Sequence, residues 1–266
     1  MSRKIAFIGC GNMATAMIGG MVGSGMAASG DIIATARTAA TLEAAESHFK
    51  IKTTHDNKEA AAFADIVILS VKPQFYPEVI KEISEIITED KIVVTVAPGI
   101  TLERLEAQFG KKVKLVRTMP NTPALVGEGM TGVCCNREVT DDEMAEVCSL
   151  MSTFGKVEVV PERLMDVVGA VSGSSPAFIF MLIEAMADAA VADGMARAQA
   201  YQFAGQAVMG SAKLLLESGK HPGELKDMVC SPGGTTIEGV RTLEAKGYKS
   251  AMFEALKACV KKSKEL

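Results

Sequence analysis

Short apolar runs alternate with amphipathic or small-residue segments through residues 1–160, the pattern of strands alternating with helices. The run Asp65–Val71, DIVILSV, is apolar almost without interruption, as expected of a strand buried on both faces of a parallel sheet. This order predicts an α/β domain over residues 1–160, built on a doubly wound, mostly parallel sheet. Further strands are expected at Lys4–Ile8, Asp31–Ala36, Lys91–Ala97, Lys114–Met119, Thr131–Asn136 and Val157–Val160, and helices at Asn12–Gly23, Thr41–Phe49, Gln74–Ile87, Thr101–Phe109 and Asp141–Phe154.

The alternation stops near residue 160, and only helices are expected after it. The two longest are apolar around much of their circumference, so they need cover on more than one face. A compact bundle would provide that cover, and so would a second copy of the chain. We favour the second, a homodimer formed through an all-α domain over residues 161–266. The expected helices are Ser174–Asp193, Ala198–Ser218, Gly223–Val229, Thr236–Glu244 and Tyr248–Lys262.

Composition narrows the functional classes. The 266 residues are 48% hydrophobic with a net charge of −4, so no nucleic-acid partner is expected, because such a partner favours a basic face. Glu184 interrupts the apolar run Pro176–Ile183, so no window is expected to cross a bilayer. With no signal peptide recognised at the start, we expect a cytoplasmic protein without a membrane partner. The six cysteines form no C-x-x-C pair and the three histidines lack ligand spacing, so no metal site is predicted.

The segment KIAFIGCGNMATAM joins the first expected strand to the first expected helix through Gly9-x-Gly11-x-x-Ala14. This spacing is typical of the turn that binds a dinucleotide pyrophosphate. The glycines let the backbone approach the phosphates, and the following helix supplies free N–H groups and a positive dipole end. The alternative is a small-residue turn that only packs helix on sheet. We assign the turn to cofactor binding, with Gly9, Cys10, Gly11, Asn12, Met13 and Ala14 as its residues.

The end of the second strand bears on which dinucleotide is bound. An NAD site usually carries Asp or Glu there, for the ribose hydroxyls. Here the strand ends Ala34-Thr35-Ala36-Arg37-Thr38, without a carboxylate. Arg37 and the threonine hydroxyls suit a 2′-phosphate, so NADP(H) is favoured and NAD(H) is kept as the alternative. A solvated surface arginine is the other interpretation of Arg37.

Three further loops follow strands at their carboxyl ends, where doubly wound sheets bind ligands. They are Ser70–Pro73, Val96–Ile100 and Met119–Pro123. Two small-residue segments, Val171–Pro176 and Ser231–Thr236, precede expected helices of the second domain. Their hydroxyls and N–H groups could hold a carboxylate, or could merely cap the helices.

Six motifs together resemble one family along nearly the whole chain. GCGNMA, SVKPQ, APGI, MPNTP, SGSSPAF and HPGELKDMVCSPGGTTIEGVRTLE occur in the order seen in pyrroline-5-carboxylate reductases. The resemblance implies NAD(P)H-dependent reduction of the cyclic imine 1-pyrroline-5-carboxylate to L-proline. It also implies an N-terminal Rossmann domain and a C-terminal helical dimerisation domain, with dimers assembling into larger rings such as a decamer.

The resemblance extends the expected site beyond the glycine turn. Thr35 and Arg37 lie where the adenosine 2′ end binds, and Asn57 lies at a position that touches the cofactor in similar proteins. Val71, Lys72 and Ala97 would line the nicotinamide side, and Ser70 and Pro73 of the same loop are also assigned to cofactor binding. For the substrate we assign Gly233, Gly234, Thr235, Thr236, Ser174, Met119 and Asn121, with Thr236 as the catalytic residue.

The residue types agree with reduction of an imine. A ketone would need a positioned His, Lys or Tyr to protonate the developing alkoxide, and the glycine–serine segments contain none. A protonated imine needs mainly orientation, and the Thr236 hydroxyl is expected to accept a hydrogen bond from its N–H. Two alternatives stay open. A β-hydroxyacid dehydrogenase would carry a lysine on the long helix, where none precedes Lys213; an NADP-binding sensor without turnover would not need SPGGTT.

Overall fold

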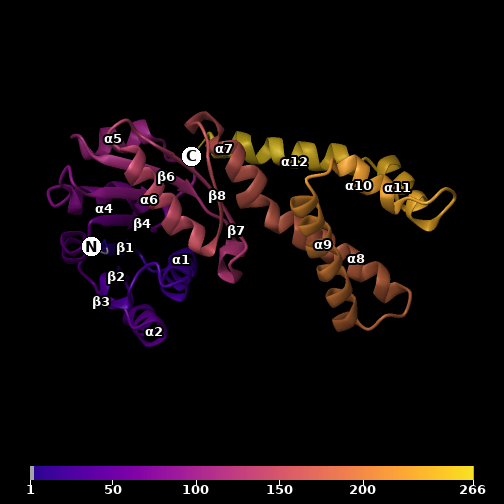
Figure 1. The fold of residues 1–266 in the computed structure, drawn as a ribbon, viewed down its shortest axis with the longest axis horizontal. Coiled ribbons are helices and arrows are strands. Elements are labelled where there is room, and N and C mark those ends of the chain that lie inside the picture. Colours follow the sequence, from indigo (N-terminus) through magenta and orange to yellow (C-terminus); the bar gives the residue numbers. More distant parts are fainter. Residues whose placement is uncertain (1–2, 266) are drawn as a thin grey trace. The chain divides into compact units, whose positions relative to one another are not determined.

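The computed structural model describes residues 3–265 and divides into two compact units (Figure 1). The first unit runs to Ser174 and also includes the end of the chain from Cys259 onward. The second unit is Ser175–Ala258. The second unit is therefore inserted between two segments of the first.

The first unit is built on one eight-stranded sheet with the order β3-β2-β1-β4-β5-β6-β7-β8. Neighbouring strands from β3 to β6 are parallel, β7 runs antiparallel to β6, and β8 is parallel to β7. The order reverses direction at β1 and β4, so the switch point of the doubly wound sheet lies there. The strands are β1 (Ile5–Ile8), β2 (Ile32–Thr35), β3 (Lys52–Thr54), β4 (Ile66–Leu69), β5 (Ile92–Thr95), β6 (Lys114–Met119), β7 (Gly129–Cys135) and β8 (Gly155–Val159).

Helices cover both faces of this sheet, as Figure 1 shows. One apolar cluster holds side chains of α1, α2 and α6, and the other holds those of α3, α4, α5 and α7. Because alternate residues of each central strand face opposite clusters, those strands are apolar throughout. The helices are α1 (Asn12–Gly23), α2 (Ala39–Phe49), α3 (Asn57–Phe63), α4 (Tyr76–Ile83), α5 (Leu102–Phe109), α6 (Asp141–Met151) and α7 (Met165–Val168).

The predicted α/β class is confirmed, and the differences concern short elements. The sequence prediction had no strand at β3 and no helix at α3. Strand β3 has three residues, all polar and none buried, so it lacks an apolar pattern. Helix α3 is seven residues long and is capped by Asp56, whose carboxylate accepts hydrogen bonds from the Lys58 and Glu59 N–H groups. The expected helix Gln74–Ile87 is shorter, because residues from Pro73 form the 3₁₀ turn η2 (Pro73–Phe75) before α4.

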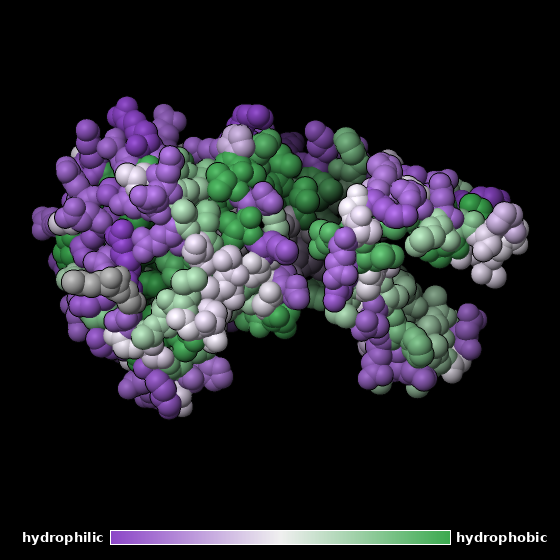
Figure 2. Space-filling model, viewed as in Figure 1, coloured by the Kyte–Doolittle hydropathy of each residue, from purple (hydrophilic) through white to green (hydrophobic). Residues whose placement is uncertain are grey.

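Helices joined by short loops make up the second unit, residues 175–258. Helices α8 and α9 pack against each other along their lengths. Both leave large apolar side chains in solvent, among them Phe180 and Met181 at 66% exposure and Phe203 at 63%, and Figure 2 shows apolar surface on this pair. An apolar surface of this kind needs a partner. The helices are α8 (Ser175–Ala192), α9 (Arg197–Ser218), α10 (Pro222–Val229), α11 (Thr235–Ala245) and α12 (Tyr248–Ser263), the last ending in the first unit.

One helical run corrects a sequence expectation. The chain is helical from Glu162 to Ala192, and by length and composition these 31 residues could cross a membrane, although no window was expected to do so. The expectation was wrong because it took Glu184 to end the apolar run, whereas apolar residues continue on both sides of that charge. The helix is also longer than expected, since it does not begin at Ser174. The π-helical segment η6 (Gly169–Ser174) instead continues α7 into α8. The same segment therefore does not present a free helix N-terminus at Val171–Pro176.

The first unit extends past the expected boundary near residue 160. Arg117 on β6 is 2% exposed, and its guanidinium lies 3.1 Å from the Glu162 carboxylate and 3.7 Å from that of Asp166. Glu162 also accepts the Leu102 N–H, at 2.7 Å. Asp166 accepts the Ser263 hydroxyl at 2.8 Å, so one buried arginine anchors both α7 and the end of the chain. A buried charge of this kind requires its partners.

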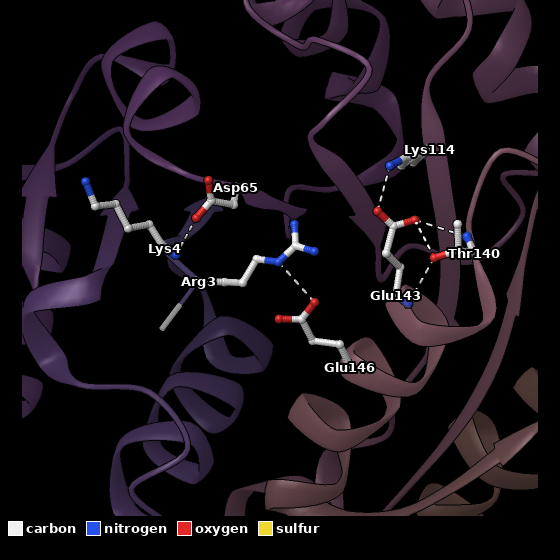
Figure 3. A network of polar contacts seen from close by, with 7 residues as sticks. All are labelled: Arg3, Lys4, Asp65, Lys114, Thr140, Glu143 and Glu146. Carbon is white, nitrogen blue, oxygen red and sulfur yellow. Dashed lines mark hydrogen bonds and ion pairs between the residues drawn. The ribbon is translucent and has the colours of Figure 1, made fainter. Parts of the chain in front are cut away.

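Charged pairs also fix the start of α6 (Figure 3). Glu143 and Thr140 form a capping box, and Lys114 on β6 lies 2.6 Å from the Glu143 carboxylate. Burial raises the pKa of Glu143, but the hydrogen bonds from Lys114 and Thr140 outweigh it and hold the pKa below its ordinary value. The pair therefore stabilises the fold only while Glu143 is ionised.

We expect Glu143→Gln to lower the free energy of unfolding by about 1–2 kcal/mol at pH 7. The depressed pKa means that this contribution is present above the unfolded-state pKa and disappears as the pH falls through the folded-state value. Denaturant unfolding of the wild type and the variant at pH 7 and pH 3 would measure the size of the loss and its dependence on pH. Glu146→Gln is the matched control, because its pair with Arg3 has side chains 33% and 34% exposed and should contribute less than about 0.5 kcal/mol. An equal loss at both pH values would contradict the assignment.

Candidate active site

The glycine turn after β1 is held by hydrogen bonds on both sides of one residue. Gly9 has φ +96°, a conformation that glycine tolerates. Its N–H donates to the Thr35 hydroxyl at 3.1 Å, and its carbonyl accepts the Ser70 hydroxyl at 2.6 Å. A Cβ at Gly9 would lie 2.8 Å from Cγ1 of Val71. The ends of β2 and β4 thus shape the turn between them, and the N–H of Gly9 is already used within the protein.

The first turn of α1 offers backbone N–H groups to a ligand. Gly11 occupies the N-cap position and no side chain caps the helix, so the first N–H groups have no partner within it. A Cβ at Gly11 would meet nothing within 4 Å. Cys10, Gly11 and Asn12 line a cleft of about 920 Å³ whose other wall is α2. An open helix N-terminus beside a cleft fits the diphosphate of a dinucleotide.

The remaining residues of the turn differ in role. Burial raises the pKa of the Cys10 thiol, and a hydrogen bond with Thr15 offsets this only in part. The thiol is therefore neutral and does not repel an anion. Ala14 is fully buried, and its small side chain lets α1 pack on the sheet. Met13 packs against the same apolar cluster.

A chain of hydrogen bonds runs from the turn to α4. The Thr35 hydroxyl, 3% exposed, donates to Oδ1 of Asn57 at 2.8 Å, and Nδ2 of Asn57 donates to Glu82 at 2.8 Å. The polar groups of Thr35 are therefore engaged within the protein. Thr35 and Asn57 therefore help to shape the turn through these bonds. No sequence signal indicated Glu82, because helical periodicity does not identify a partner on another element.

Arg37 and Thr38 follow the end of β2 and are exposed. The Thr38 and Thr41 hydroxyls lie 2.8 Å apart, and Thr41 lines the cleft. His55 contacts the Ala36 carbonyl through Nδ1 at 2.8 Å. These residues carry hydroxyl, guanidinium and imidazole groups and no carboxylate, a donor set that suits a phosphate.

The loops after β4 and β5 hold the residues expected on the nicotinamide side. Val71 and Pro73 are half-buried, Lys72 is exposed and Ala97 is buried. Behind them the Tyr76 hydroxyl donates to the Leu69 carbonyl at 2.7 Å. Burial raises the pKa of Tyr76, and the hydroxyl of Thr95 and the backbone of Val96 and Ala97 also face the phenol oxygen. Tyr76, which the sequence did not single out, thus supports both loops.

Three expected substrate residues lie in the first unit. Asn121 is 8% exposed; its Oδ1 accepts the Met130 N–H at 2.8 Å and its Nδ2 donates to the Ser172 carbonyl at 3.0 Å. Its amide therefore holds η6 against the end of β6. The Met119 side chain comes within 4 Å of the Cβ position at Gly169. The Ser174 hydroxyl donates to the Gly169 carbonyl at 3.3 Å.

The other four lie at the start of α11 in the second unit. Gly233 has φ +67°, and the Gly234 N–H donates to the Ser231 carbonyl at 3.0 Å. Gly234 is the N-cap of α11 and no side chain caps it, while Thr235 and Thr236 are exposed. This eleven-residue helix therefore presents open N–H groups and two hydroxyls to solvent. Such a terminus can bind a carboxylate. Over residues 3–265, no cluster of His, Cys, Asp and Glu could hold a metal ion.

Comparison with known proteins identifies the family. The pyrroline-5-carboxylate reductase dimerisation model matches residues 162–266, and the coenzyme F420-dependent NADP oxidoreductase model matches residues 4–99. The chain is 50% identical over 266 residues to the pyrroline-5-carboxylate reductase of Escherichia coli K12, covering all of this chain and 99% of that one. The chain belongs to the pyrroline-5-carboxylate reductase family.

Solved structures of the family show the same fold. The pyrroline-5-carboxylate reductase of Coxiella burnetii is similar with a TM-score of 0.92 and 35% identity, covering 100% of this chain and 98% of that one. The pyrroline carboxylate reductase of Plasmodium falciparum, solved with NADP bound, has a TM-score of 0.90 and 28% identity, covering 99% and 97%. The Rossmann domain and the helical dimerisation domain expected from the sequence are confirmed.

Proposed function

We propose that this member of the pyrroline-5-carboxylate reductase family catalyses NADPH-dependent reduction of 1-pyrroline-5-carboxylate to L-proline. The full-length match to the Escherichia coli reductase carries this proposal. A β-hydroxyacid dehydrogenase would carry a lysine on the long helix after the sheet domain. None precedes Lys213 on the long helices of this chain, which disfavours that activity.

NADP(H) fits the first unit by its residues. The open N-terminus of α1 would hold the diphosphate, Arg37 and Thr38 would hold the 2′-phosphate, and the loops after β4 and β5 would flank the nicotinamide. When bound, the cofactor supplies the hydride. The protein supplies orientation, since the turn, Thr35 and Ser70 are already fixed by hydrogen bonds and need no rearrangement.

The start of α11 has groups that can bind the carboxylate and the iminium nitrogen of the substrate. Its N–H groups, with the backbone of Gly234 and Thr235, would hold the carboxylate, and the Thr236 hydroxyl would accept the iminium N–H. A protonated imine becomes a neutral amine on reduction. No general acid is needed, because the hydride goes to the carbon and the nitrogen already carries its proton; a hydroxyl that keeps the nitrogen in one orientation is sufficient.

The dimerisation model supports an oligomer. The apolar surface of α8 and α9 would be covered by a second copy of the chain, and a ring of dimers such as a decamer is our proposal for the larger assembly. The run Glu162–Ala192 would then lie at a protein interface rather than in a membrane. We place the protein in the cytoplasm, a reducing compartment that suits its six free cysteines.

NADPH oxidation by the purified protein with 1-pyrroline-5-carboxylate tests the reaction. NADH and a 3-hydroxyacid with NADP⁺ are run in parallel. Turnover of the imine with preference for NADPH is expected. Preference for NADH would retain the reaction and refute the role of Arg37. Activity on the hydroxyacid alone would overturn the proposal, and so would cofactor binding without any turnover.

A further inference from the structure

Two loops on either side of the glycine turn touch each other through their side chains. The Arg37 guanidinium carbon lies over the ring of Phe75, 4.9 Å from its centroid. Arg37 follows β2 and Phe75 ends η2 after β4, while β1 lies between these strands in the sheet. Adjacent strands are about 4.8 Å apart, so the contact spans the carboxyl end of β1, where the glycine turn begins.

The contact leaves the binding groups of the arginine available. A cation–π contact is an electrostatic attraction to the ring and takes up no lone-pair acceptor, so the guanidinium keeps N–H donors for other partners. Arg37 is exposed and makes no carboxylate pair that would compete for those donors among the contacts of residues 3–265. Arg37 in contact with Phe75 can therefore still bind a phosphate.

The ring is held more firmly than the arginine. Phe75 is half-buried, and the residue after it, Tyr76, is fully buried and bonded to the Leu69 carbonyl. Pro73 fixes the start of the same 3₁₀ turn. An exposed arginine that rests on a fixed ring has already lost much of its rotamer freedom, and less is lost when it binds a ligand.

We propose that Phe75 is a specificity-determining positioning residue that holds Arg37 ready for the 2′-phosphate of NADP(H). The inference rests on the proposed role of Arg37 in cofactor binding. It assigns the preference for NADP(H) over NAD(H) to a pair of side chains, one from each loop beside the turn, rather than to Arg37 alone.

Calorimetric binding of NADP⁺ and NAD⁺ to the full-length protein tests this without turnover. The two ligands differ only in the 2′-phosphate, so the ratio of their dissociation constants isolates it. Phe75→Leu is expected to weaken NADP⁺ binding by about threefold to fivefold, the loss typical of an exposed cation–π contact, and to leave NAD⁺ binding unchanged. Phe75→Tyr keeps the ring and should keep the ratio.

Phe63→Leu is the matched control, because the ring of Phe63 lies under Lys4 and Lys52, at 5.0 and 4.3 Å, away from the turn. It should leave both affinities unchanged. In an Arg37→Ala background, Phe75→Leu should have no further effect. Equal weakening of both ligands by Phe75→Leu, or an unchanged ratio, would overturn the inference. If Arg37→Ala alone leaves the ratio unchanged, the inference fails with the role of Arg37, while turnover of the imine still tests the reaction.

Discussion

Thr236→Val is expected to lower kcat/KM for 1-pyrroline-5-carboxylate by about 10- to 100-fold, the range for loss of a hydrogen bond to a charged group. Valine keeps the shape of threonine and removes only the acceptor for the iminium N–H. Thr236 is exposed at the second position of α11, so the substitution should leave stability nearly unchanged. Steady-state kinetics with saturating NADPH would measure the effect.

Thr242→Val is the matched control for this prediction. Thr242 lies on the same helix, but its hydroxyl donates to the Glu238 carbonyl at 2.9 Å, so it is occupied within the helix. The control should retain full kcat/KM. If Thr236→Val also retains it, the Thr236 hydroxyl does not bind the substrate nitrogen and orientation must come from the backbone of α11 alone.

Arg37→Ala is expected to lower kcat/KM with NADPH by about 10- to 100-fold and to leave kcat/KM with NADH almost unchanged. The reason is that a guanidinium–phosphate pair is charge-assisted and NADH lacks the phosphate. The measurement is the ratio of the two values, taken at fixed imine concentration and at two salt concentrations. The loss should shrink at high salt, because the site is exposed and screened.

Thr35→Val provides the contrast. Its hydroxyl holds the Gly9 N–H and Asn57, so its loss should disturb the turn and weaken both cofactors alike. Thr35 would then support the glycine turn, whereas Arg37 would bind the 2′-phosphate, although both lie near the end of β2. A loss confined to NADPH in Thr35→Val would mean that the buried hydroxyl reaches the 2′ end itself.

Long elements with a clear apolar pattern could be predicted from the sequence. The predicted bounds Asn12–Gly23 and Lys114–Met119 match α1 and β6. Strand β3 escaped prediction because it is polar and at the sheet edge, and the π-helical segment η6 escaped because small residues there resemble a helix start. Contacts between distant segments, such as Glu82 with Asn57 and Phe75 with Arg37, follow from packing that one sequence pattern does not encode.

The roles assigned to the site residues stay predictions, but their placement in the fold can be compared with the sequence. The glycine turn and the loops after the strands could be expected, because chain order and strand ends place them on one edge. The sequence could not predict which of their side chains form hydrogen bonds within the protein. Thr35, Asn57 and Ser70 were expected at the cofactor, and this stays a prediction. The structure adds that their side chains form hydrogen bonds within the protein, and neither burial nor hydrogen-bond direction is visible in composition.

The bond between Ser263 and Asp166 has a consequence for synthesis of the chain. The two residues are 97 positions apart, and the whole helical unit lies between them. Domains generally fold in order from the N-terminus as the ribosome produces them. Here the first unit lacks this contact until the ribosome has produced Ser263. A chain interrupted before Ser263 would leave the buried Arg117 with one carboxylate partner, Asp166, whose own hydrogen bond is missing.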